Sequence, residues 1–402
     1  MQNHPADQEP RRVLGSFFTP KSQNTPTWEQ RKFEEIAVRS SVMSDKKGLP
    51  RVEYEDIISG AGRLNKDIKL KESEKVGIVF HKGDVLYGKL RPYLQNWLLA
   101  SFNGLAVGDF WVLQPQNTDS SFLYRLVQSQ QFDGVANQST GTKMPRADWK
   151  LVSKTKFAMP HSVDEQAAIG AYFEHLDTLI TLHQRKYEKL VNIKKSMLDK
   201  MFPQNGASVP EIRFKGFTDP WEQRKVGTLI EDYTEKTVTQ NQYPVLTSSQ
   251  QQGIVLQEDY FADRQVTTDN NVGYYVLPKG YFTYRSRSDT DVFVFNRNNI
   301  VDKGIISYYY PVFAPKSCDS NFLLRRLNHG IKKQLSMAAE GTGQKVLAHA
   351  KFKNMVVDVP SQSEQEKIGT ILEELDTLIT LHQRKLEKLQ NIKKSCLEKM
   401  FV

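Results

Sequence analysis

Leu176–Phe202 reads LDTLITLHQRKYEKLVNIKKSMLDKMF, and Leu375–Phe401 reads LDTLITLHQRKLEKLQNIKKSCLEKMF. The two stretches lie 199 positions apart and differ at only four positions. A repeat of this kind indicates a doubled architecture, because two nearly identical elements can relate two halves of a chain by a pseudo-twofold axis. The two halves of the chain can therefore be compared residue by residue.

The duplication continues upstream in a weaker form. The pentapeptide WEQRK occurs at 28–32 and again at 221–225, so each repeat begins at a tryptophan. The segments that follow are alike only in short patches, such as Asp119–Leu123 and Asp319–Leu323. This pattern predicts one scaffold that presents two different versions of a globular module, each of which recognises a different feature.

Composition bounds the class of protein. A chain of 402 residues favours two to three domains, and 39% apolar residues are enough for packed cores. The formal charge of +9 and the pI of about 9.2 favour a polyanionic partner such as nucleic acid, although a charge surplus that serves solubility looks the same. No run approaches 18 apolar residues and the N-terminus is polar, so we expect a soluble, cytoplasmic protein.

Catalytic and metal-binding signatures are absent from the sequence. The two cysteines, Cys318 and Cys396, fall at unmatched positions, so neither a disulfide framework nor a zinc site is expected. The sequence contains no P-loop, no Rossmann fingerprint, no GxSxG elbow and no Asn-Pro-Pro or Asp-Pro-Pro motif of an amino-methyltransferase. We therefore expect a chain that is not an enzyme and holds no cofactor or metal itself.

The repeated stretches predict two long helices. Each begins with acidic and polar residues, at 164–166 and 363–365, shortly after a proline, and continues to the end of its repeat for about 38 residues, or roughly 57 Å. The apolar residues have the spacing of an interhelical seam, which predicts an antiparallel coiled-coil spacer with one helix from each half; the core of an ordinary helical domain is the alternative. The seam positions are Leu176, Leu179, Ile180, Leu182, Tyr187, Leu190, Ile193, Met197 and Met201, and Leu375, Leu378, Ile379, Leu381, Leu386, Leu389, Ile392, Cys396 and Met400.

Polar residues of the helices are repeated as faithfully as the apolar ones. This near-identity predicts two equivalent docking surfaces for two copies of a partner, although a recent duplication would also leave them alike. The positions are Gln184, Arg185 and Lys186 in the first copy and Gln383, Arg384 and Lys385 in the second.

The modules are expected to be mixed α/β, because β-rich runs are bounded by Gly, Pro, Asn or Asp. A short helix is expected at 122–130 and at 322–327. The fold class is therefore α+β. The expected strands are 76–80, 84–87 and 110–113 in the first module, and 272–277, 281–284, 292–295 and 305–313 in the second.

Two basic features stand out in each module. Strand alternation is expected to place Arg285 and Arg287 on one face with Tyr281 and Thr283. A glycine-containing loop at 140–146 is matched at 341–345, and its Lys, Arg and Gln side chains suit phosphate oxygens or base edges; a solvated strand edge or a polar turn is the plainer alternative. The candidate DNA contacts are Lys89, Arg91, Tyr93, Lys143, Arg146, Arg285, Arg287, Gln344 and Lys345.

The tandem of WEQRK, a variable module, a helix start after proline and a LDTLITLHQRK helix ending in KMF resembles the specificity subunit of type I restriction-modification systems. The second half carries the lead-in IRFKGFTDPW at 212–221, whereas the first has PKSQNTPTW at 20–28. The resemblance implies two target-recognition domains, each reading one half of a bipartite DNA sequence. It also implies docking of two methyltransferase subunits and of restriction subunits, which would use S-adenosylmethionine, ATP and Mg.

Because the modules differ, we expect an asymmetric target whose half-sites are centred about one helical turn apart. Two other classes stay open: a single-chain pseudodimeric transcription regulator, and a scaffold that clamps two proteins without binding DNA. The predicted domains are an N-terminal tail at 1–27, target-recognition domain 1 at 28–161, repeat helix 1 at 162–202, a linker at 203–220, target-recognition domain 2 at 221–361 and repeat helix 2 at 362–402.

Overall fold

The computed structural model describes residues 28–68, 74–138, 144–204, 207–261 and 270–401. The predicted N-terminal tail lies outside these residues. Contacts divide the chain into two compact units, unit 1 (1–184 with 384–402) and unit 2 (185–383). Each unit contains one module, the first part of one long helix and the last part of the other. The predicted domain boundaries stay predictions.

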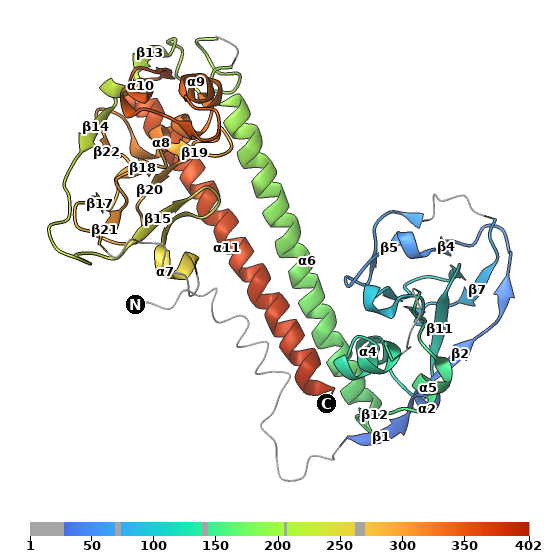
Figure 1. Ribbon diagram of the computed structural model, residues 1–402. Coiled ribbons are helices and arrows are strands. Elements are labelled where there is room, and N and C mark those ends of the chain that lie inside the picture. Colours follow the sequence, from blue (N-terminus) through green and yellow to red (C-terminus); the bar gives the residue numbers. More distant parts are fainter. Residues whose placement is uncertain (1–27, 69–73, 139–143, 205–206, 262–269, 402) are drawn as a thin grey trace. The chain divides into compact units, whose positions relative to one another are not determined.

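Unit 1 is built on two four-stranded sheets (Figure 1). Strand β11 (Phe110–Pro115) belongs to the first sheet, and its side chains alternate between two cores. Trp111 and Leu113 face the core that also holds helix side chains, whereas Phe110 and Val112 face the core of the second sheet. Both faces of this strand are therefore buried, which explains its continuous apolar sequence.

The elements of unit 1 are as follows. The first sheet has the order β2 (Ala37–Ser40), β11, β8 (Val85–Gly88), β9 (Trp97–Leu99), and the second has the order β3 (Met43–Ser44), β7 (Gly77–Phe80), β10 (Gly104–Ala106), β4 (Arg51–Val52). The remaining pairs are β1 (Glu29–Lys32) with β12 (Lys156–Met159) and β5 (Ile57–Ile58) with β6 (Arg63–Leu64). The short helices are α2 (Phe33–Ile36), η2 (Tyr54–Asp56), η4 (Pro92–Leu94), α3 (Ser120–Leu126), α4 (Gln130–Ala136) and α5 (Trp149–Lys154).

Unit 2 repeats the first sheet of unit 1 with the same order of equivalent strands. That sheet runs β14 (Ile230–Tyr233), β22 (Val312–Pro315), β18 (Phe282–Tyr284), β20 (Phe295–Arg297). The strand pairs are β13 (Glu222–Lys225) with β24 (Val356–Val359), β15 (Leu246–Ser249) with β16 (Gly253–Leu256), β17 (Tyr275–Pro278) with β21 (Lys303–Ile306), and β19 (Arg287–Ser288) with β23 (Lys345–Val346). The short helices are η5 (Val226–Thr228), α7 (Gln257–Tyr260), α8 (Ser320–Asn328), α9 (Lys332–Ala338) and α10 (His349–Lys353).

The predicted α+β class is confirmed, and most expected strands occur within a few residues of their positions. Two expectations about strands were wrong. The run 305–313 is two strands, β21 and β22, separated by a turn that contains Tyr308 and Tyr309. Strand β18 ends at Tyr284, so Arg285 and Arg287 do not share a strand with Thr283, whose side chain is buried and donates to the Pro311 carbonyl.

The long helices have the predicted length: α6 (Val163–Lys200) has 38 residues and α11 (Gln362–Met400) has 39. In unit 1 the first part of α6 packs against the last part of α11, and Leu176 shares a core with Leu389. In unit 2 the last part of α6 packs against the first part of α11, and Met197 packs against the core that holds Leu372. The two helices therefore run in opposite directions within each unit (Figure 1).

Four residues of the expected seam are exposed. Leu182 and Ile193 of α6 and Leu378 and Leu381 of α11 are 37–45% accessible. At about 100° per residue Leu182, Ile193 and Leu381 lie at the edge of the apolar stripe, and a helix that faces one partner buries only the centre of such a stripe. Leu378 lies near the centre of its stripe and is exposed nonetheless. Their placement in the interhelical seam was wrong.

A glutamine fixes the start of each long helix to its module. The Gln166 side chain donates to the Pro160 carbonyl and accepts from the Asp119 N–H, each at 2.9 Å. Gln365 makes the same two bonds, with the Pro360 carbonyl and the Asp319 N–H, also at 2.9 Å. This pairing explains why glutamine follows proline by a few residues in both halves of the sequence.

The residue before that glutamine has a different partner in each unit. In unit 1, the Trp28 Nε1–H donates to Glu165 at 3.0 Å. In unit 2, Arg213 donates to both oxygens of Glu364 at 2.7 Å. Arg213 belongs to the lead-in that the first half lacks, so the difference between the two lead-ins corresponds to two different ways of holding a helix start.

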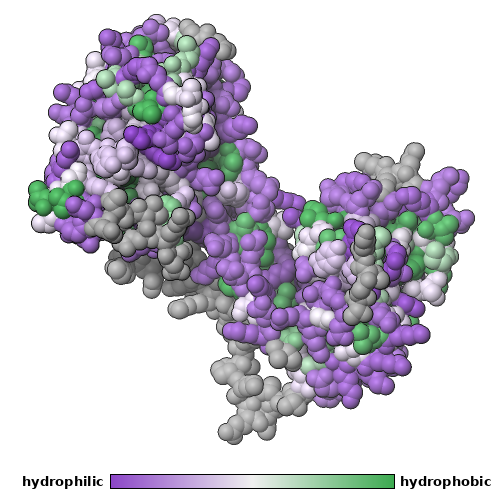
Figure 2. Space-filling model, in the orientation of Figure 1, coloured by the Kyte–Doolittle hydropathy of each residue, from purple (hydrophilic) through white to green (hydrophobic). Residues whose placement is uncertain are grey.

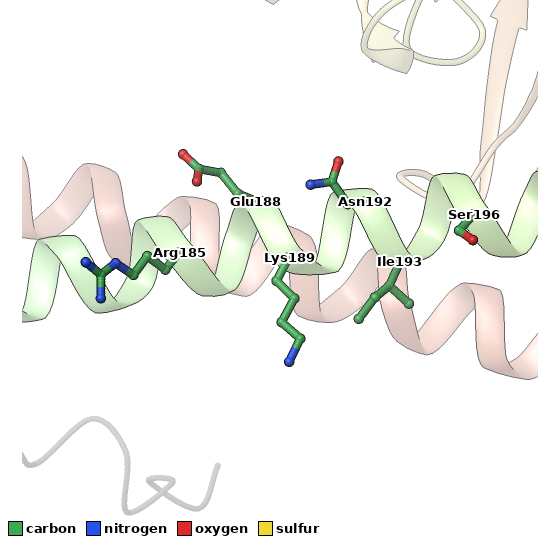
Figure 3. Close-up of a pocket in the computed structure, with 6 residues that line it drawn as sticks. All are labelled: Arg185, Glu188, Lys189, Asn192, Ile193 and Ser196. Carbon is green, nitrogen blue, oxygen red and sulfur yellow. The ribbon is translucent and has the colours of Figure 1, made fainter. Parts of the chain in front are cut away.

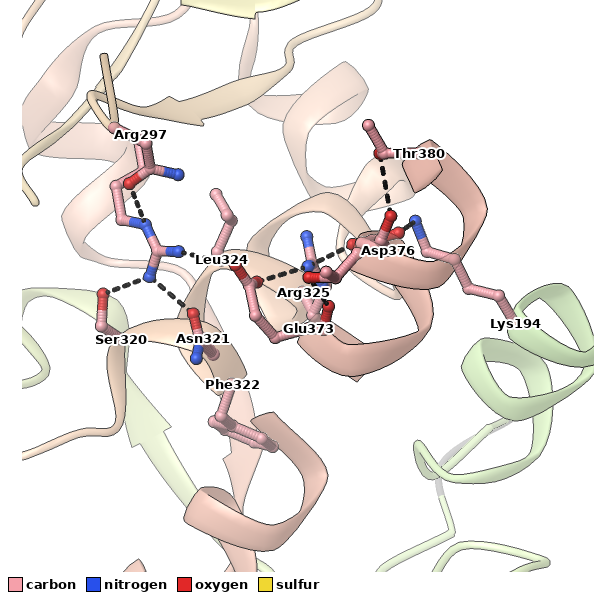
Figure 4. Close-up of polar contacts among 12 residues, drawn as sticks. Lys194, Arg297, Ser320, Asn321, Phe322, Leu324, Arg325, Glu373, Asp376 and Thr380 are labelled. Carbon is pink, nitrogen blue, oxygen red and sulfur yellow. Dashed lines mark hydrogen bonds and ion pairs between the residues drawn. The ribbon is translucent and has the colours of Figure 1, made fainter. Parts of the chain in front are cut away.

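Each unit also contains an ion-paired cluster centred on an aspartate of a long helix. In unit 1, Asp177 of α6 accepts from Arg125 of α3 at 2.7 Å and from Lys393 of α11 at 2.6 Å. In unit 2, the repeat-equivalent Asp376 of α11 pairs with Arg325 of α8 and Lys194 of α6 (Figure 4). Each aspartate therefore joins its module to both long helices.

The described surface is mainly hydrophilic in the view of Figure 2, with hydrophobic side chains in small groups. None of the helices in the described ranges is both long enough and apolar enough to cross a membrane.

Candidate nucleic-acid interface

The two basic segments predicted in the first module lie side by side in unit 1. Leu90 forms an antiparallel bridge with Arg146. The Arg91 N–H donates to the Pro145 carbonyl at 2.7 Å, and the Ala147 N–H donates to the Lys89 carbonyl at 2.8 Å. Lys89, Arg91 and Arg146 therefore lie on adjacent backbone segments, which we call face 1. Lys143 lies outside the described residues.

A single carboxylate partly offsets the positive charge of face 1. Asp109 pairs with Lys89 at 3.5 Å and with Arg146 at 3.0 Å. Tyr54 donates to the Asp109 carbonyl at 2.7 Å, and burial raises the pKa of Tyr54, so this hydroxyl stays protonated. With Arg91 counted, three cations surround one anion, and face 1 keeps a net positive charge that favours phosphate.

The corresponding segments come together in unit 2 through strand pairing. In the β19–β23 pair, Arg287 lies opposite Val346 and Ser288 lies opposite Lys345. The Leu347 N–H extends the pairing by donating to the Ser286 carbonyl at 2.8 Å. This pairing defines face 2, which consists of Arg285, Arg287, Gln344 and Lys345. Arg285 and Arg287 are exposed.

Face 2 differs from face 1 in its aromatic and acidic neighbours. The Arg287 guanidinium lies 4.2 Å from the centre of the Tyr309 ring, which packs against Tyr308 with a centroid separation of 4.2 Å. Asp289 accepts from Gln344 at 2.9 Å and lies 3.8 Å from Arg285. The two faces therefore share a backbone arrangement but present different side chains.

Sequence reasoning missed several residues of these faces. Asp109, Asp289, Tyr308 and Tyr309 received no role, and the two tyrosines were assigned to a strand. Pro311 after three tyrosines was the available turn signal, since proline cannot donate to a central strand. Tyr281, which was expected beside the arginines, packs instead on Tyr233 with a centroid separation of 4.9 Å.

Each long helix also carries a shallow groove at repeat-equivalent positions. Figure 3 shows the groove on α6. The α6 groove lies in unit 2 and has a volume of about 480 Å³; the α11 groove lies in unit 1 and has a volume of about 440 Å³. The lining residues are Arg185, Glu188, Lys189, Asn192, Ile193 and Ser196 in the first, and Arg384, Glu387, Lys388, Asn391, Ile392 and Ser395 in the second.

Two of the six predicted partner-binding residues, Arg185 and Arg384, line these grooves. Lys186 and Gln383 are exposed outside the lining, whereas Gln184 and Lys385 are half-buried. The lining residues downstream were missed although their identity between the two copies was visible. Within the described part of the chain, no group of three or more His, Cys, Asp or Glu side chains is placed to hold a metal ion.

Comparison with known proteins agrees with this architecture. Residues 219–391 match the family described as the type I restriction modification DNA specificity domain. The specificity subunit of the type I restriction enzyme EcoDI from Escherichia coli is 25% identical over 127 residues, which cover 31% of this chain and 28% of that protein. The specificity subunit of the MjaVIII enzyme from Methanocaldococcus jannaschii is 23% identical over 289 residues, which cover 65% and 64%.

The likeness in fold extends over almost the whole chain. The crystal structure of a type I restriction-modification S subunit from M. genitalium matches with a TM-score of 0.59 at 13% identity, covering 95% of this chain and 98% of that one. The likeness to that structure is one of fold, and the matched domain covers the second module and most of α11. Residues 219–391 therefore carry a type I restriction modification DNA specificity domain, and the chain is similar to type I restriction enzyme specificity subunits. Its matches span less than two thirds of the length of either curated relative.

Proposed function

We propose that this chain is the DNA-addressing subunit of a type I restriction-modification complex, in which faces 1 and 2 each read one half of an asymmetric bipartite target. The observation that carries the proposal is that both units bring two separate basic segments onto one face, through the Leu90–Arg146 bridge in unit 1 and the β19–β23 pair in unit 2. The shared backbone with different side chains fits two half-sites of different sequence.

In this proposal the long helices act as an antiparallel coiled-coil spacer that separates the half-sites by an unread gap. The opposed packing of α6 and α11 in each unit supports it. The chain itself would be non-catalytic, cytoplasmic and free of cofactors. Two methyltransferase subunits and the restriction subunits would supply the chemistry with S-adenosylmethionine, ATP and Mg. The comparisons do not favour the transcription-regulator alternative.

The two repeat-equivalent grooves are the proposed docking sites for the two methyltransferase copies. Each groove is lined by basic and acidic side chains together with an asparagine and an isoleucine. This mixture suits a protein partner better than a nucleic acid. Their identity between the copies fits two identical partners, whereas the faces that read DNA differ.

A methylation map tests the addressing role first. DNA from cells that carry this gene with its neighbouring methyltransferase gene is expected to show a gapped, bipartite adenine-methylation motif, and deletion of this gene alone is expected to remove it. The two halves of the motif should differ in sequence. A palindromic motif, or methylation that persists after the deletion, would contradict the proposal.

Alanine variants of the two faces are expected to weaken DNA binding by the assembled complex. Loss of a base contact should cost about 1–3 kcal/mol of binding free energy and relax one target position, whereas loss of a phosphate contact should weaken all sequences and flatten the salt dependence. The variants are Arg91→Ala and Arg146→Ala for face 1, and Arg285→Ala and Arg287→Ala for face 2. Fluorescence anisotropy over a salt series measures both quantities.

The matched controls are Lys82→Ala and Lys279→Ala. These exposed lysines precede β8 and β18, at the opposite end of those strands from the two faces, and they occupy equivalent positions. They change the net charge by the same amount without touching either face. If the controls weaken binding as much as the face variants do, general charge rather than the two faces determines affinity.

Charge reversal in the grooves is expected to remove the partner copies one at a time. Lys189→Glu should remove one methyltransferase copy, Lys388→Glu the other, and the double variant both, because the lysines are repeat-equivalent lining residues. Native mass spectrometry of the purified complex counts the copies. Lys195→Glu, an exposed lysine of α6 that is neither in the lining nor among the predicted docking residues, is the control. Full occupancy in the double variant would show that the grooves are not the docking sites.

A further inference from the structure

An unusual turn follows directly on Arg91 of face 1. Arg91 and Gln95 adopt left-handed backbone conformations, with φ of 50° and 56°, and flank the 3-10 turn η4. Such conformations are disfavoured for residues other than glycine and persist where surrounding contacts hold them. Two of them within five residues indicate a backbone whose shape is fixed by its neighbours.

Hydrogen bonds hold this turn at both ends. The Arg91 N–H donates to the Pro145 carbonyl at 2.7 Å, and the Gly60 N–H donates to the Gln95 carbonyl at 3.0 Å. Within the turn, the Leu94 N–H donates to the Arg91 carbonyl at 2.9 Å. The Pro92 ring is buried beneath the turn. The backbone is therefore pre-organised before any partner binds.

The side chains at the top of this turn are apolar and exposed. Tyr93 is 56% and Leu94 38% accessible, and Met144, next to the Pro145 that anchors the turn, is 46% accessible. The neighbouring charged side chains of face 1 are Lys89, Arg91 and Arg146, with Asp109 as their only acidic partner among the described ion pairs. An exposed apolar tip surrounded by cations fits a polyanion that also has an apolar interior, and stacked duplex DNA has both properties.

We propose that Tyr93 and Leu94 form an apolar wedge that inserts between two base pairs of the half-site read by unit 1. This inference rests on the proposed function. Cations position the phosphates while the apolar side chains partly unstack one base step, as side chains of this kind do in proteins that kink DNA. That half-site is then read partly through the ease with which the step deforms, which favours flexible pyrimidine–purine steps.

Face 2 supplies the natural contrast. The exposed tyrosines beside face 2 already contact each other and Arg287. The Tyr308 hydroxyl donates a hydrogen bond of 3.0 Å to the Tyr309 hydroxyl, and the Arg287 guanidinium lies over the Tyr309 ring. Rings that already pack against one another and against a cation gain less from entering a base step. We therefore expect the deformation to occur in only one half-site.

The test uses the assembled complex and duplexes that carry the mapped target with 2-aminopurine at each position in turn. Apart from the two target adenines, which methyltransferase subunits extrude themselves, wild type should raise the fluorescence of the probe at one step of one half-site, because unstacking relieves the quenching of this base. Tyr93→Ala with Leu94→Ala should abolish that signal, reduce affinity for the target about 10-fold, and relax the methylated motif at the same step. Tyr308→Ala, the matched variant in unit 2, should leave the signal in place.

Conservative variants keep the test independent of folding. Tyr93→Phe with Leu94→Met retains the apolar surface and should retain the fluorescence signal. If the alanine double variant leaves the signal, the affinity and the motif unchanged while wild type shows a gapped motif, the wedge is wrong and the addressing role stands. If wild type produces no gapped motif, both proposals are overturned.

Discussion

Replacing Arg213 by alanine is expected to destabilise unit 2 by about 3–5 kcal/mol of unfolding free energy. The Glu364 carboxylate is buried, with 1% of its side chain accessible, and both of its oxygens accept from Arg213 at 2.7 Å. Removal of the guanidinium leaves a buried charge without its partner, which costs far more than the intact pair contributes. The start of α11 should loosen first, because Glu364 lies in its first turn.

Hydrogen exchange followed by mass spectrometry measures this effect separately in each unit. Peptides from unit 2 should exchange faster in the variant, and peptides from unit 1 should not change. Glu165→Ala is the control, because the equivalent glutamate in unit 1 accepts a single exposed hydrogen bond from Trp28. Arg213→Leu with Glu364→Leu should recover most of the lost stability, since it removes both charges together. No recovery would mean that Arg213 acts through packing rather than charge.

The large features of the fold could be predicted from the sequence because each rests on a local or a repeated signal. The length of α6 and α11 followed from apolar periodicity and start signals within one segment. The pairing of modules with helices followed from comparison of the two halves. Arg91 and Arg146 were chosen as basic residues in two separate segments, and the structure shows that backbone pairing brings these segments together.

What could not be predicted depends on contacts between distant segments. No local sequence signal indicates that Leu90 pairs with Arg146, or that the strand through Thr283 ends before Arg285. Hydrogen bonding between distant segments determines both. Exposure around a helix is also a tertiary property. Ile193 has the spacing of a seam residue and lines a groove instead. The roles of Asp109 and Asp289 required knowing which cations lie beside them.

Replacing Asp177 by alanine is expected to cost unit 1 about 3 kcal/mol, roughly twice the cost of Asp376→Ala in unit 2. Both aspartates join a module arginine and a lysine of the other long helix, so removal of either breaks the same pair of contacts. The two costs differ because the two arginines keep different acidic partners once the aspartate is removed. Arg325 keeps Glu373, which lies 3.0 Å away, as a second carboxylate.

Arg125 has no second carboxylate as a partner among the described ion pairs. It is 4% accessible, and without Asp177 its remaining polar side-chain partner is Gln128 at 3.4 Å, with the rings of Tyr124 and Phe173 beside it. A buried guanidinium that keeps only an amide and two rings loses most of its compensation for desolvation. Exchange rates of unit 1 peptides in Asp177→Ala and of unit 2 peptides in Asp376→Ala measure the two costs.

A third variant tests whether the second carboxylate causes the difference. Asp376→Ala combined with Glu373→Ala should raise the cost in unit 2 to the level of Asp177→Ala or above it, because Arg297 also lies 3.6 Å from Glu373 and would lose that carboxylate as well. Equal costs for Asp177→Ala and Asp376→Ala would show that the lysine contacts between the helices, which the two units share, determine the stability of both clusters. Unequal costs in the expected order would mean that the duplicated aspartate contributes differently in its two copies, because the modules around it have diverged.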